Sequence, residues 1–207
     1  MNSTYFITGI GTEVGKTVVS AIVTEAIEAD YFKPIQAGDL DYSDTHKVKA
    51  LVSNTKSTFF DNAYALKTPM SPHAAADIDN LEIDLNKIQR PKTENNLVIE
   101  GAGGLLVPLN SKDCIIDLIE KTDKIILVSR HYLGSINHTL LSVEALKNRG
   151  FSNIGIIFSG DEHPTTENII LVKTQLPCVG RISEEDNFSK DVVSKYAKQL
   201  KLNLKKL

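Results

Sequence analysis

The stretch YFITGIGTEVGKT, residues 5–17, combines a short β-type segment with a glycine-rich turn and a Lys-Thr pair. Apolar residues at helical spacing follow the pair, so the pattern predicts a strand, a loop and a helix that ends near Glu28. Backbone N–H groups of such a loop and the positive end of the helix dipole converge on one point, which suits a phosphate group. Lys16 is then placed to reach the terminal phosphates of a nucleotide, and the Thr17 hydroxyl is placed to bind Mg²⁺.

The loop is one residue longer than the common phosphate-binding motif. That motif has about four residues between its first glycine and its Gly-Lys pair, whereas the five residues 10–14 separate Gly9 from Gly15 here. A glycine turn with an unrelated surface lysine is the alternative interpretation. The strand before the loop and the apolar helix after it favour the phosphate site, because the motif is specific only in that context.

An acidic residue, Glu100, closes the apolar run NLVIE at residues 96–100 and precedes the glycine-rich turn GAGG. The run predicts a buried parallel strand, which would carry the carboxylate to the C-terminal edge of a sheet. A carboxylate buried there needs a cation, and beside a phosphate loop that cation is expected to be Mg²⁺. The alternative is an acid that merely ends a strand.

Two more charged residues follow the first predicted helix. Lys33 stands in YFKPI, residues 31–35, a predicted short strand that is ended by Pro34. Ligands of open α/β folds bind at such strand ends, so Lys33 is a candidate site residue, with a flanking surface lysine as the alternative. Asp44 precedes a predicted helix over 45–52, where it is either a helix cap or a second Mg²⁺ ligand.

Beyond these motifs the sequence alternates between β-type and α-type segments. The later predicted strands cover 96–100, 124–129, 153–158 and 177–182, and the later predicted helices cover 81–89, 113–122, 136–149, 166–174 and 187–200. A polar stretch over 54–80 is expected to be irregular, apart from a short helix that opens at 74–76. The alternation predicts an α/β fold with an open, mostly parallel sheet and helices on both faces, a Rossmann-like three-layer sandwich of the P-loop NTPase type. The length suits a single domain over 1–207.

The composition is that of a globular protein, with 42% hydrophobic residues, 24% charged residues and a net charge of −3. That balance provides no broad basic surface, so nucleic acid is not expected as a partner. No membrane-spanning run and no signal peptide are predicted, so we expect a cytoplasmic protein without a membrane partner. Cys114 and Cys178 stand in no metal-binding cluster and are expected to be buried free thiols.

Taken together, these residues indicate phosphoryl transfer from a nucleotide, driven by positioning and by charge neutralisation. A side-chain nucleophile with a base partner is not evident in the sequence, and this chemistry does not require one. The residues do not identify the acceptor of the phosphoryl group.

Five motifs resemble those of the dethiobiotin synthetase family, and they occur in the family's order across nearly the whole chain. The motifs are GxGTEVGKT at 9–17, KPxQxG at 33–38, SPH at 71–73, EGAGG at 100–104 and LGxINH at 133–138. The first and fourth motifs are shared with related amidoligases, whereas the second and last are more particular to this family.

The resemblance implies a C–N-forming cyclo-ligase of biotin synthesis, which closes the ureido ring of dethiobiotin. Its substrates would be 7,8-diaminononanoate, CO₂ or bicarbonate, and ATP, with Mg²⁺ as cofactor. One amine captures CO₂ as a carbamate, and the carbamate oxygen attacks the γ-phosphate to give a carbamic-phosphoric anhydride. The second amine then closes the ring and expels phosphate.

The resemblance also implies roles for the residues that match the motifs. The implied catalytic residues are Lys33, Lys16 and Thr12. The implied nucleotide-binding residues are Glu13, Val14, Gly15, Lys16, Thr17, Val18, Glu100, Gly101, Gly103 and Ser159. The implied Mg²⁺ ligands are Thr17, Asp44 and Glu100. The implied substrate-binding residues are Thr12, Lys33, Ala37, Gly104, Leu133, Gly134, Ser135, Ile136 and Asn137.

The family further implies a homodimer with active sites at the subunit interface. Residues 134–137, at a predicted helix start, would receive the carboxylate tail of the substrate from the partner subunit. Two positions depart from the family pattern. Ala37 stands where a Ser or Thr is usual, and Ser159 stands where many members place an Asn that contacts adenine, which leaves the nucleotide base preference open.

The main alternative from another class is a P-loop switch ATPase of the partitioning or positioning type, which acts through a protein partner. Such switches carry an extra lysine early in the loop, where this chain has Gly11. A corrin-ring amidating enzyme is disfavoured because it usually adds a glutaminase domain. A form that binds nucleotide without turnover is disfavoured by the intact Lys16, Thr17 and Glu100.

Overall fold

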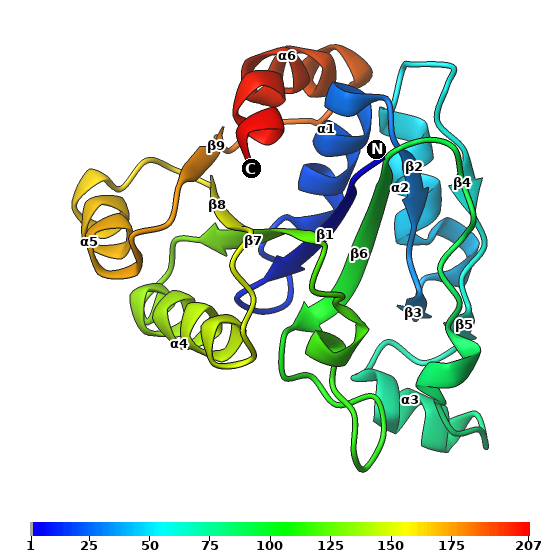
Figure 1. The fold of residues 1–207 in the computed structure, drawn as a ribbon. Helices are drawn as coiled ribbons and strands as arrows, with labels where there is room; N and C mark the ends of the chain where they lie inside the picture. The colour runs from blue at the N-terminus through cyan, green and yellow to red at the C-terminus, as the bar shows by residue number, and fades with distance from the viewer. Residues whose placement is uncertain (1) are drawn as a thin grey trace.

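The computed structural model describes residues 2–207 and confirms the predicted α/β architecture (Figure 1). A sheet of seven strands runs in the order β4-β2-β6-β1-β7-β8-β9. Its strands are β1 (Thr4–Gly9), β2 (Asp30–Phe32), β4 (Phe59–Phe60), β6 (Leu97–Gly104), β7 (Lys124–Arg130), β8 (Ile154–Ser159) and β9 (Cys178–Ile182). The pairings in this sheet are all parallel, so the C-terminal ends of the strands share one edge.

Helices cover both faces of the sheet (Figure 1). They are α1 (Lys16–Ile27), α2 (Asp44–Leu51), α3 (Pro72–Ile78), α4 (Ser135–Asn148), α5 (Pro164–Thr174) and α6 (Lys190–Lys206). The helix after the phosphate loop therefore ends one residue before the predicted Glu28, and the last helix extends beyond its predicted end at 200.

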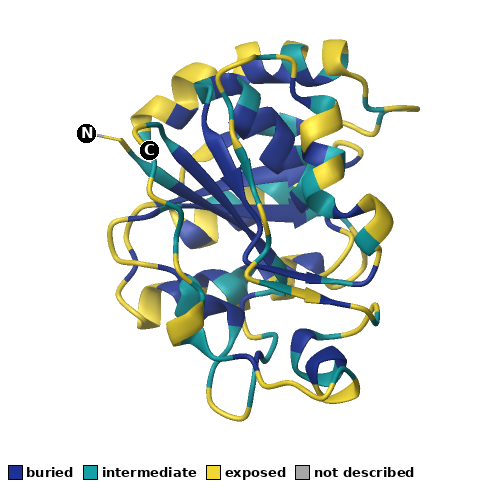
Figure 2. Ribbon diagram, turned by 90° about the vertical axis from the view of Figure 1, so that its right-hand side faces the viewer, coloured by how far each residue is buried: buried dark blue, intermediate teal, exposed yellow. Residues whose placement is uncertain are grey.

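The strands separate two apolar cores, because successive side chains of a strand point to opposite faces. Tyr5 and Ile7 of β1 pack into the core that contains the buried sides of α1, α2 and α6. Phe6, between them, packs into the second core with Ile115 and with Leu146 of α4. Figure 2 shows the result as buried strands in the centre and helices whose outer surfaces are exposed.

The predicted strand over 31–35 is divided in two at Pro34. β2 ends at Phe32, and a new strand, β3 (Ile35–Ala37), leaves the main sheet to pair with β5 (Tyr64–Leu66) in a separate two-stranded parallel sheet. Pro34 has no N–H to donate to a ladder, which explains the break. The stretch 54–80, which was expected to be irregular, holds β4 and β5, strands of two and three residues that are too short for a periodic signal.

Two predicted helices are wrong. The segments 81–89 and 113–122 each contain only a single 3-10 turn, at Leu85–Lys87 and Ile115–Leu118. Ile83, Ile115, Ile116 and Ile119 are buried, whereas Leu81 is exposed, so the apolar pattern reflected the burial of single residues and did not reflect an α-helix. In both turns a nearby aspartate accepts a local backbone N–H, which favours a turn over a continued helix.

The prediction of two buried thiols is also wrong, although both cysteines are free. Cys114 is half-buried, and Cys178 is exposed at the start of β9. β9 is the last strand of the sheet, so its first residue lacks a neighbour on one side. Within residues 2–207 no helix is long and apolar enough to cross a membrane.

Candidate active site

The phosphate loop connects the end of β1 with the start of α1, at the edge where the parallel strands end. Gly9 has no room for a side chain, because a Cβ there would lie 2.5 Å from Val14 Cγ2. Gly15 is the N-cap of α1 and adopts a left-handed conformation with φ 94°. A Cβ on Gly15 would also lie 2.8 Å from Ser159 Oγ. Glycine is therefore required at both positions of the lengthened loop.

Lys16 is the first residue of α1 and its side chain turns back over the loop. It is 7% exposed, and its Nζ donates a hydrogen bond to Gly11 O at 2.7 Å. Burial, followed by the ammonium of Lys33, lowers the pKa of Lys16 to about 8. An incompletely solvated ammonium at a helix N-terminus is suited to bind an anion such as a terminal phosphate.

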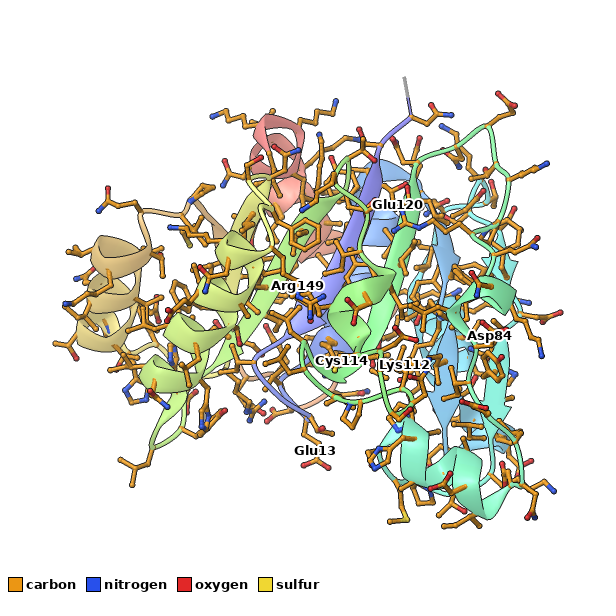
Figure 3. All side chains as sticks on the ribbon, turned by 60° about the horizontal axis from the view of Figure 1, so that its bottom comes forward. Glu13, Asp84, Lys112, Cys114, Glu120 and Arg149 are labelled. Carbon is orange, nitrogen blue, oxygen red and sulfur yellow. The ribbon has the colours of Figure 1, made fainter. Side chains whose placement is uncertain are left out.

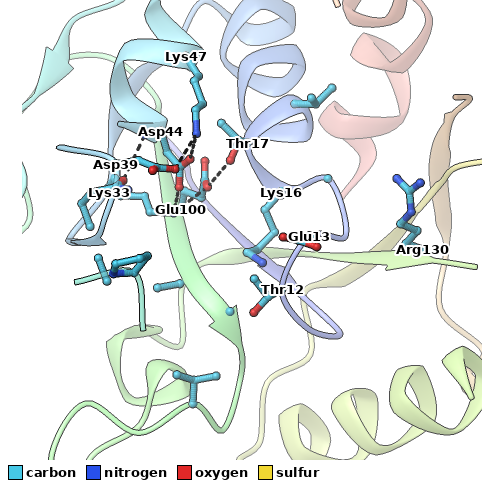
Figure 4. A pocket seen from close by; sticks show the side chains of 18 of the residues that line it. Thr12, Glu13, Lys16, Thr17, Lys33, Asp39, Asp44, Lys47, Glu100 and Arg130 are labelled. Atoms are coloured by element: carbon cyan, nitrogen blue, oxygen red, sulfur yellow. Dashed lines mark hydrogen bonds and ion pairs between the residues drawn. The ribbon is translucent and has the colours of Figure 1, made fainter. Parts of the chain in front are cut away.

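Lys33 lies between two carboxylates just after β2 (Figure 4). Its Nζ is 2.6 Å from Asp44 Oδ2 and 2.9 Å from Glu100 Oε1, and it donates to Gly101 O at 3.3 Å. Thr17 Oγ1 donates to the same oxygen of Glu100 at 3.0 Å. We call Thr17, Lys33, Asp44 and Glu100 the acidic cluster. It joins the phosphate loop helix to the end of β2, to the middle of β6 and to the start of α2.

The charges of the acidic cluster stabilise one another. Burial lowers the pKa of Lys33, but Glu100 and Asp44 outweigh burial and hold that pKa above its ordinary value. Burial raises the pKa of the Asp44 carboxyl, yet the charge of Lys33 and its hydrogen bond hold the net value below the usual range. Both shifts favour the ionised pair. Lys47, one turn further along α2, lies 3.6 Å from Asp44 Oδ1.

Tyr31 completes the surroundings of Glu100. The tyrosine is fully buried, and its hydroxyl donates to Glu100 Oε2 at 2.8 Å. Burial and the charge of Glu100 raise the pKa of Tyr31 well above its ordinary value, so the phenol remains a donor. Each oxygen of this buried carboxylate is therefore hydrogen-bonded.

The oxygen donors of Thr17, Asp44 and Glu100 suit Mg²⁺. This ion prefers one or two carboxylates, a hydroxyl or water, and phosphate oxygens, rather than a cage made by protein alone. Residues 2–207 contain no group of three or more His, Cys, Asp or Glu that could hold a metal ion. The carboxylates of Asp44 and Glu100 both contact the ammonium of Lys33, so a cation is needed between them to neutralise their charge.

A cleft of about 830 Å³ extends from the acidic cluster along the phosphate loop. The predicted site residues that line it are Thr12, Glu13, Gly15, Lys16, Thr17, Val18, Lys33, Ala37, Asp44, Glu100, Gly103 and Ser159. Glu13 projects from the tip of the loop (Figure 3). Most of the residues predicted from the sequence are thus brought together in one place.

Three predicted residues lie behind the cleft. Val14 is buried under the loop, and Gly101 contributes its carbonyl to Lys33. Gly104 supports the loop from β6, because a Cβ there would lie 3.7 Å from the backbone N of Gly11. These residues shape the site and do not line its surface.

The predicted substrate-binding segment 133–137 lies apart from the cleft of its own chain. It connects β7 with α4, and Gly134 is the left-handed N-cap of that helix. Leu133 is fully exposed, and Ile136 is exposed on the first turn. The structure therefore does not bring this segment to the acidic cluster within one subunit.

Sequence reasoning missed several residues of the cleft and its supports. Tyr31 precedes Lys33 by two positions on an extended segment, so the period of a strand was an available signal that both point to one side. Lys47 follows Asp44 by one helical turn. Arg130 ends β7 as Glu100 ends its apolar run, and it forms an ion pair with Glu184 at 3.0 Å at the far end of the cleft.

Comparisons with known proteins show the family of this chain. A family model described as an AAA domain matches residues 3–191. The ATP-dependent dethiobiotin synthetase BioD of Christiangramia forsetii is 67% identical over 204 residues, which are 99% of each chain. The protein of the same name from Cytophaga hutchinsonii is 49% identical over 198 residues, which are 95% of this chain and 96% of that protein.

Solved structures with a similar fold have low sequence identity. A putative plasmid partition protein from Borrelia burgdorferi, bound to AMPPNP, gives a TM-score of 0.62 at 14% identity and covers 100% of this chain and 99% of its own. A ParA family ATPase from Chlorobium tepidum gives a TM-score of 0.54 at 12% identity and covers 97% of this chain and 91% of its own. These likenesses show the fold alone. The high identity to the synthetases over nearly full length shows that this chain belongs to the ATP-dependent dethiobiotin synthetase family.

Proposed function

We propose that this chain is an ATP-dependent dethiobiotin synthetase, which forms the ureido ring of dethiobiotin from 7,8-diaminononanoate and CO₂ and releases ADP and phosphate. The observation that carries the proposal is the acidic cluster, in which a buried lysine and two carboxylates lie directly beside a phosphate loop. The identity to proteins of that name supports the same reaction. The chain would work in the cytoplasm as one ligase domain over 1–207.

The nucleotide would bind with its phosphates over the loop between β1 and α1. Backbone N–H groups of the loop and the ammonium of Lys16 would hold the β- and γ-phosphates. Thr17, Asp44 and Glu100 would hold Mg²⁺, which when bound neutralises charge on those phosphates. Glu13, Val18 and Gly103 would shape the pocket around the phosphate chain.

The chemistry would proceed by positioning and electrostatic stabilisation. One amine of the substrate adds to CO₂ and loses a proton, which gives a carbamate. A carbamate oxygen then bonds to the γ-phosphorus while the bond to the ADP oxygen breaks. The second amine attacks the carbamoyl carbon, loses a proton, and phosphate leaves with the carbamate oxygen. Lys33 and Lys16 would stabilise the negative charge in these steps, and Thr12 would orient the carbamate.

The substrate would occupy the part of the cleft that Ala37, Pro69 and Ser71 line. Ala37 has no hydroxyl to offer, so Gln36 and the backbone of the second sheet would supply the polar contacts. The segment 133–137 lies away from this part of the cleft in its own chain, so we assign it to the substrate tail of a partner subunit in a homodimer. The exposed Leu133 and Ile136 support this placement, because apolar side chains of that size favour burial in an interface.

The nucleotide base would lie at the other end of the cleft, near Ser159, Arg130 and Glu184. Ser159 has a shorter side chain than asparagine and abuts Gly15 of the loop. It offers a weaker contact to the adenine edge, so we expect ATP to be favoured only modestly over CTP and GTP.

The test is phosphate release from ATP with Mg²⁺ and bicarbonate, measured with and without 7,8-diaminononanoate. We expect release that depends on the diamine and a product with the mass of dethiobiotin. Repetition with CTP and GTP measures the base preference. Hydrolysis that does not depend on the diamine would contradict the proposal and favour a switch ATPase that acts through a protein partner.

A further inference from the structure

The two oxygens of the Glu100 carboxylate accept hydrogen bonds from different groups of residues. Oε1 accepts hydrogen bonds from Thr17 at 3.0 Å and from Lys33 at 2.9 Å, on the side of the phosphate loop. Oε2 accepts a hydrogen bond from the Tyr31 hydroxyl at 2.8 Å, on the side of the sheet interior. The Glu100 side chain has no exposed surface, so it has no water to replace these contacts.

The position of Tyr31 follows from the sheet. β2 pairs with β6, and Tyr31 is opposite Val98, two residues before Glu100. On the other side of β2, the ring of Phe59 from β4 lies 6.2 Å from the ring of Tyr31. The phenol is thus held between two neighbouring strands, and its hydroxyl has a fixed direction toward the carboxylate.

A buried tyrosine hydroxyl usually finds a hydrogen-bond acceptor, so its bond alone is no sign of function. Tyr5 provides the comparison within this chain. It is also buried, but its hydroxyl donates to the backbone carbonyl of Leu204 at 3.0 Å, away from the cleft. Tyr31 differs because its acceptor is a side chain that the proposed reaction uses.

We propose that Tyr31 is a positioning residue for the Mg²⁺ ligand Glu100, an inference that rests on the metal site of the proposed function. By binding Oε2, the phenol would fix the carboxylate so that Oε1 faces Thr17 and the phosphate loop. A ligand that is already oriented loses less freedom when it binds a cation. Hydrogen-bond partners of this kind typically change metal affinity or activity by about 10- to 100-fold.

The test is the affinity of the full chain for Mn²⁺ in the presence of AMPPNP, followed by the electron paramagnetic resonance signal of free Mn²⁺. Tyr31→Phe keeps the ring and removes the donor, and we expect it to weaken Mn²⁺ binding by about 10- to 100-fold. Tyr5→Phe makes the same chemical change away from the cleft, and its Mn²⁺ affinity is expected to equal that of the wild type. Unchanged affinity in Tyr31→Phe, or an equal loss in Tyr5→Phe, would overturn the inference.

A second pair of variants tests the inference if Tyr31→Phe does not fold because Glu100 has lost its hydrogen bond from Tyr31. Glu100→Ala is compared with the double variant Tyr31→Phe/Glu100→Ala, both of which bind Mn²⁺ through Asp44, Thr17 and the nucleotide. Because Tyr31 acts through Glu100, the two variants should have the same Mn²⁺ affinity. A further loss in the double variant would contradict the positioning role. An absence of Mn²⁺ binding in the wild type would instead refute the proposed metal site itself.

Discussion

At the scale of single residues, Lys33 is the side chain on which the site depends most. It is buried and contacts both carboxylates of the acidic cluster, so it contributes to folding as well as to the proposed chemistry. Removing one partner of a buried ion pair leaves the other charge without compensation. The sequence placed Lys33 at a strand end, but it could not show that the lysine, Asp44 and Glu100 form one group.

The substitution Lys33→Gln is expected to abolish turnover and to lower the free energy of unfolding by about 3–5 kcal/mol, because the buried carboxylate of Glu100 and the partly buried carboxylate of Asp44 lose their cation. Mg²⁺ should restore part of this stability in the variant and change the wild type less. Urea unfolding with and without Mg²⁺ measures both effects. The matched control is Lys56→Gln, which removes the partner of Glu28 at an exposed site and should leave the unfolding midpoint unchanged. Equal stability of the two variants would contradict the account.

The lowered pKa of Lys16 predicts a proton linkage. In the ligand-free protein this lysine loses its proton near pH 8, whereas the unfolded chain keeps it to about 10.5. Lys16 therefore opposes folding below about pH 8, and this cost disappears as the pH rises from about 8 to 10.5. Phosphates favour the ammonium, so AMPPNP binding at about pH 8.5 should take up protons.

Calorimetry of AMPPNP binding in buffers of different ionisation enthalpy measures this uptake. AMP is the control, since it lacks the terminal phosphates that Lys16 is expected to contact. Proton uptake with AMP as large as with AMPPNP, or none with AMPPNP, would show that Lys16 does not meet the terminal phosphates.

At the scale of elements, lack of space for a side chain explains why the phosphate loop needs glycine at certain positions. Gly15 combines a positive φ with a close approach to Ser159, so a side chain there is excluded twice. By contrast, the nearest atom to a Cβ on Gly11 would be Tyr132 Oη, at 4.0 Å. The two glycines have different roles although they belong to the same motif.

Gly15→Ala is expected to cost about 1–2 kcal/mol from the left-handed backbone alone, and more from the contact with Ser159. Its affinity for AMPPNP should fall, because the loop must shift. Gly11→Ala is the control and should retain the stability of the wild type. Urea unfolding and AMPPNP titration compare the two. Equal destabilisation of Gly15→Ala and Gly11→Ala would contradict the steric requirement for glycine at position 15.

The elements also show what the sequence can and cannot predict. Long, strongly patterned segments such as α1, β7 and α4 were predicted within one or two residues, because their apolar period extends over several turns or pairs. The helices predicted over 81–89 and 113–122 were wrong, because a short apolar run has the same sequence pattern in a helix and in a buried turn. β3 was not separated from β2, and β5 was not predicted, because the pairing of β3 with β5 depends on contacts between distant parts of the chain.

At the scale of the whole molecule, the acidic cluster is assembled by the order of the strands. β6 lies between β1 and β2, so Glu100 meets both the phosphate loop helix and Lys33. The parallel sheet was predictable from the β-α alternation, and with it the edge that carries the site. The strand order was not, and therefore the contact between Tyr31 and Glu100 could not be predicted.

An exposed apolar group around the start of α4 predicts the assembly of the protein. Its members are Tyr132, Leu133, Ile136 and Leu141, and Leu133 is 103% exposed. If this group forms the interface of the proposed homodimer, Leu133→Asp should yield monomers in sedimentation velocity and lower turnover. Leu202→Asp, at an exposed position on the distant helix α6, is the control and should remain dimeric. A dimer that survives Leu133→Asp would place the interface elsewhere.

In the proposed reaction, the cleft activates a carboxylated diamine through the γ-phosphate of ATP. In the most direct measurement, freshly dissolved C¹⁸O₂ is mixed with the protein, ATP, Mg²⁺ and 7,8-diaminononanoate in ordinary water. The reaction is stopped within seconds, and the ¹⁸O content of the released phosphate is determined by mass spectrometry. We expect one ¹⁸O in each phosphate formed, because the carbamate oxygen that attacks the γ-phosphorus leaves with the phosphate. Phosphate without label under these conditions would mean that water hydrolyses ATP, and it would contradict the proposed phosphorylation of the carbamate.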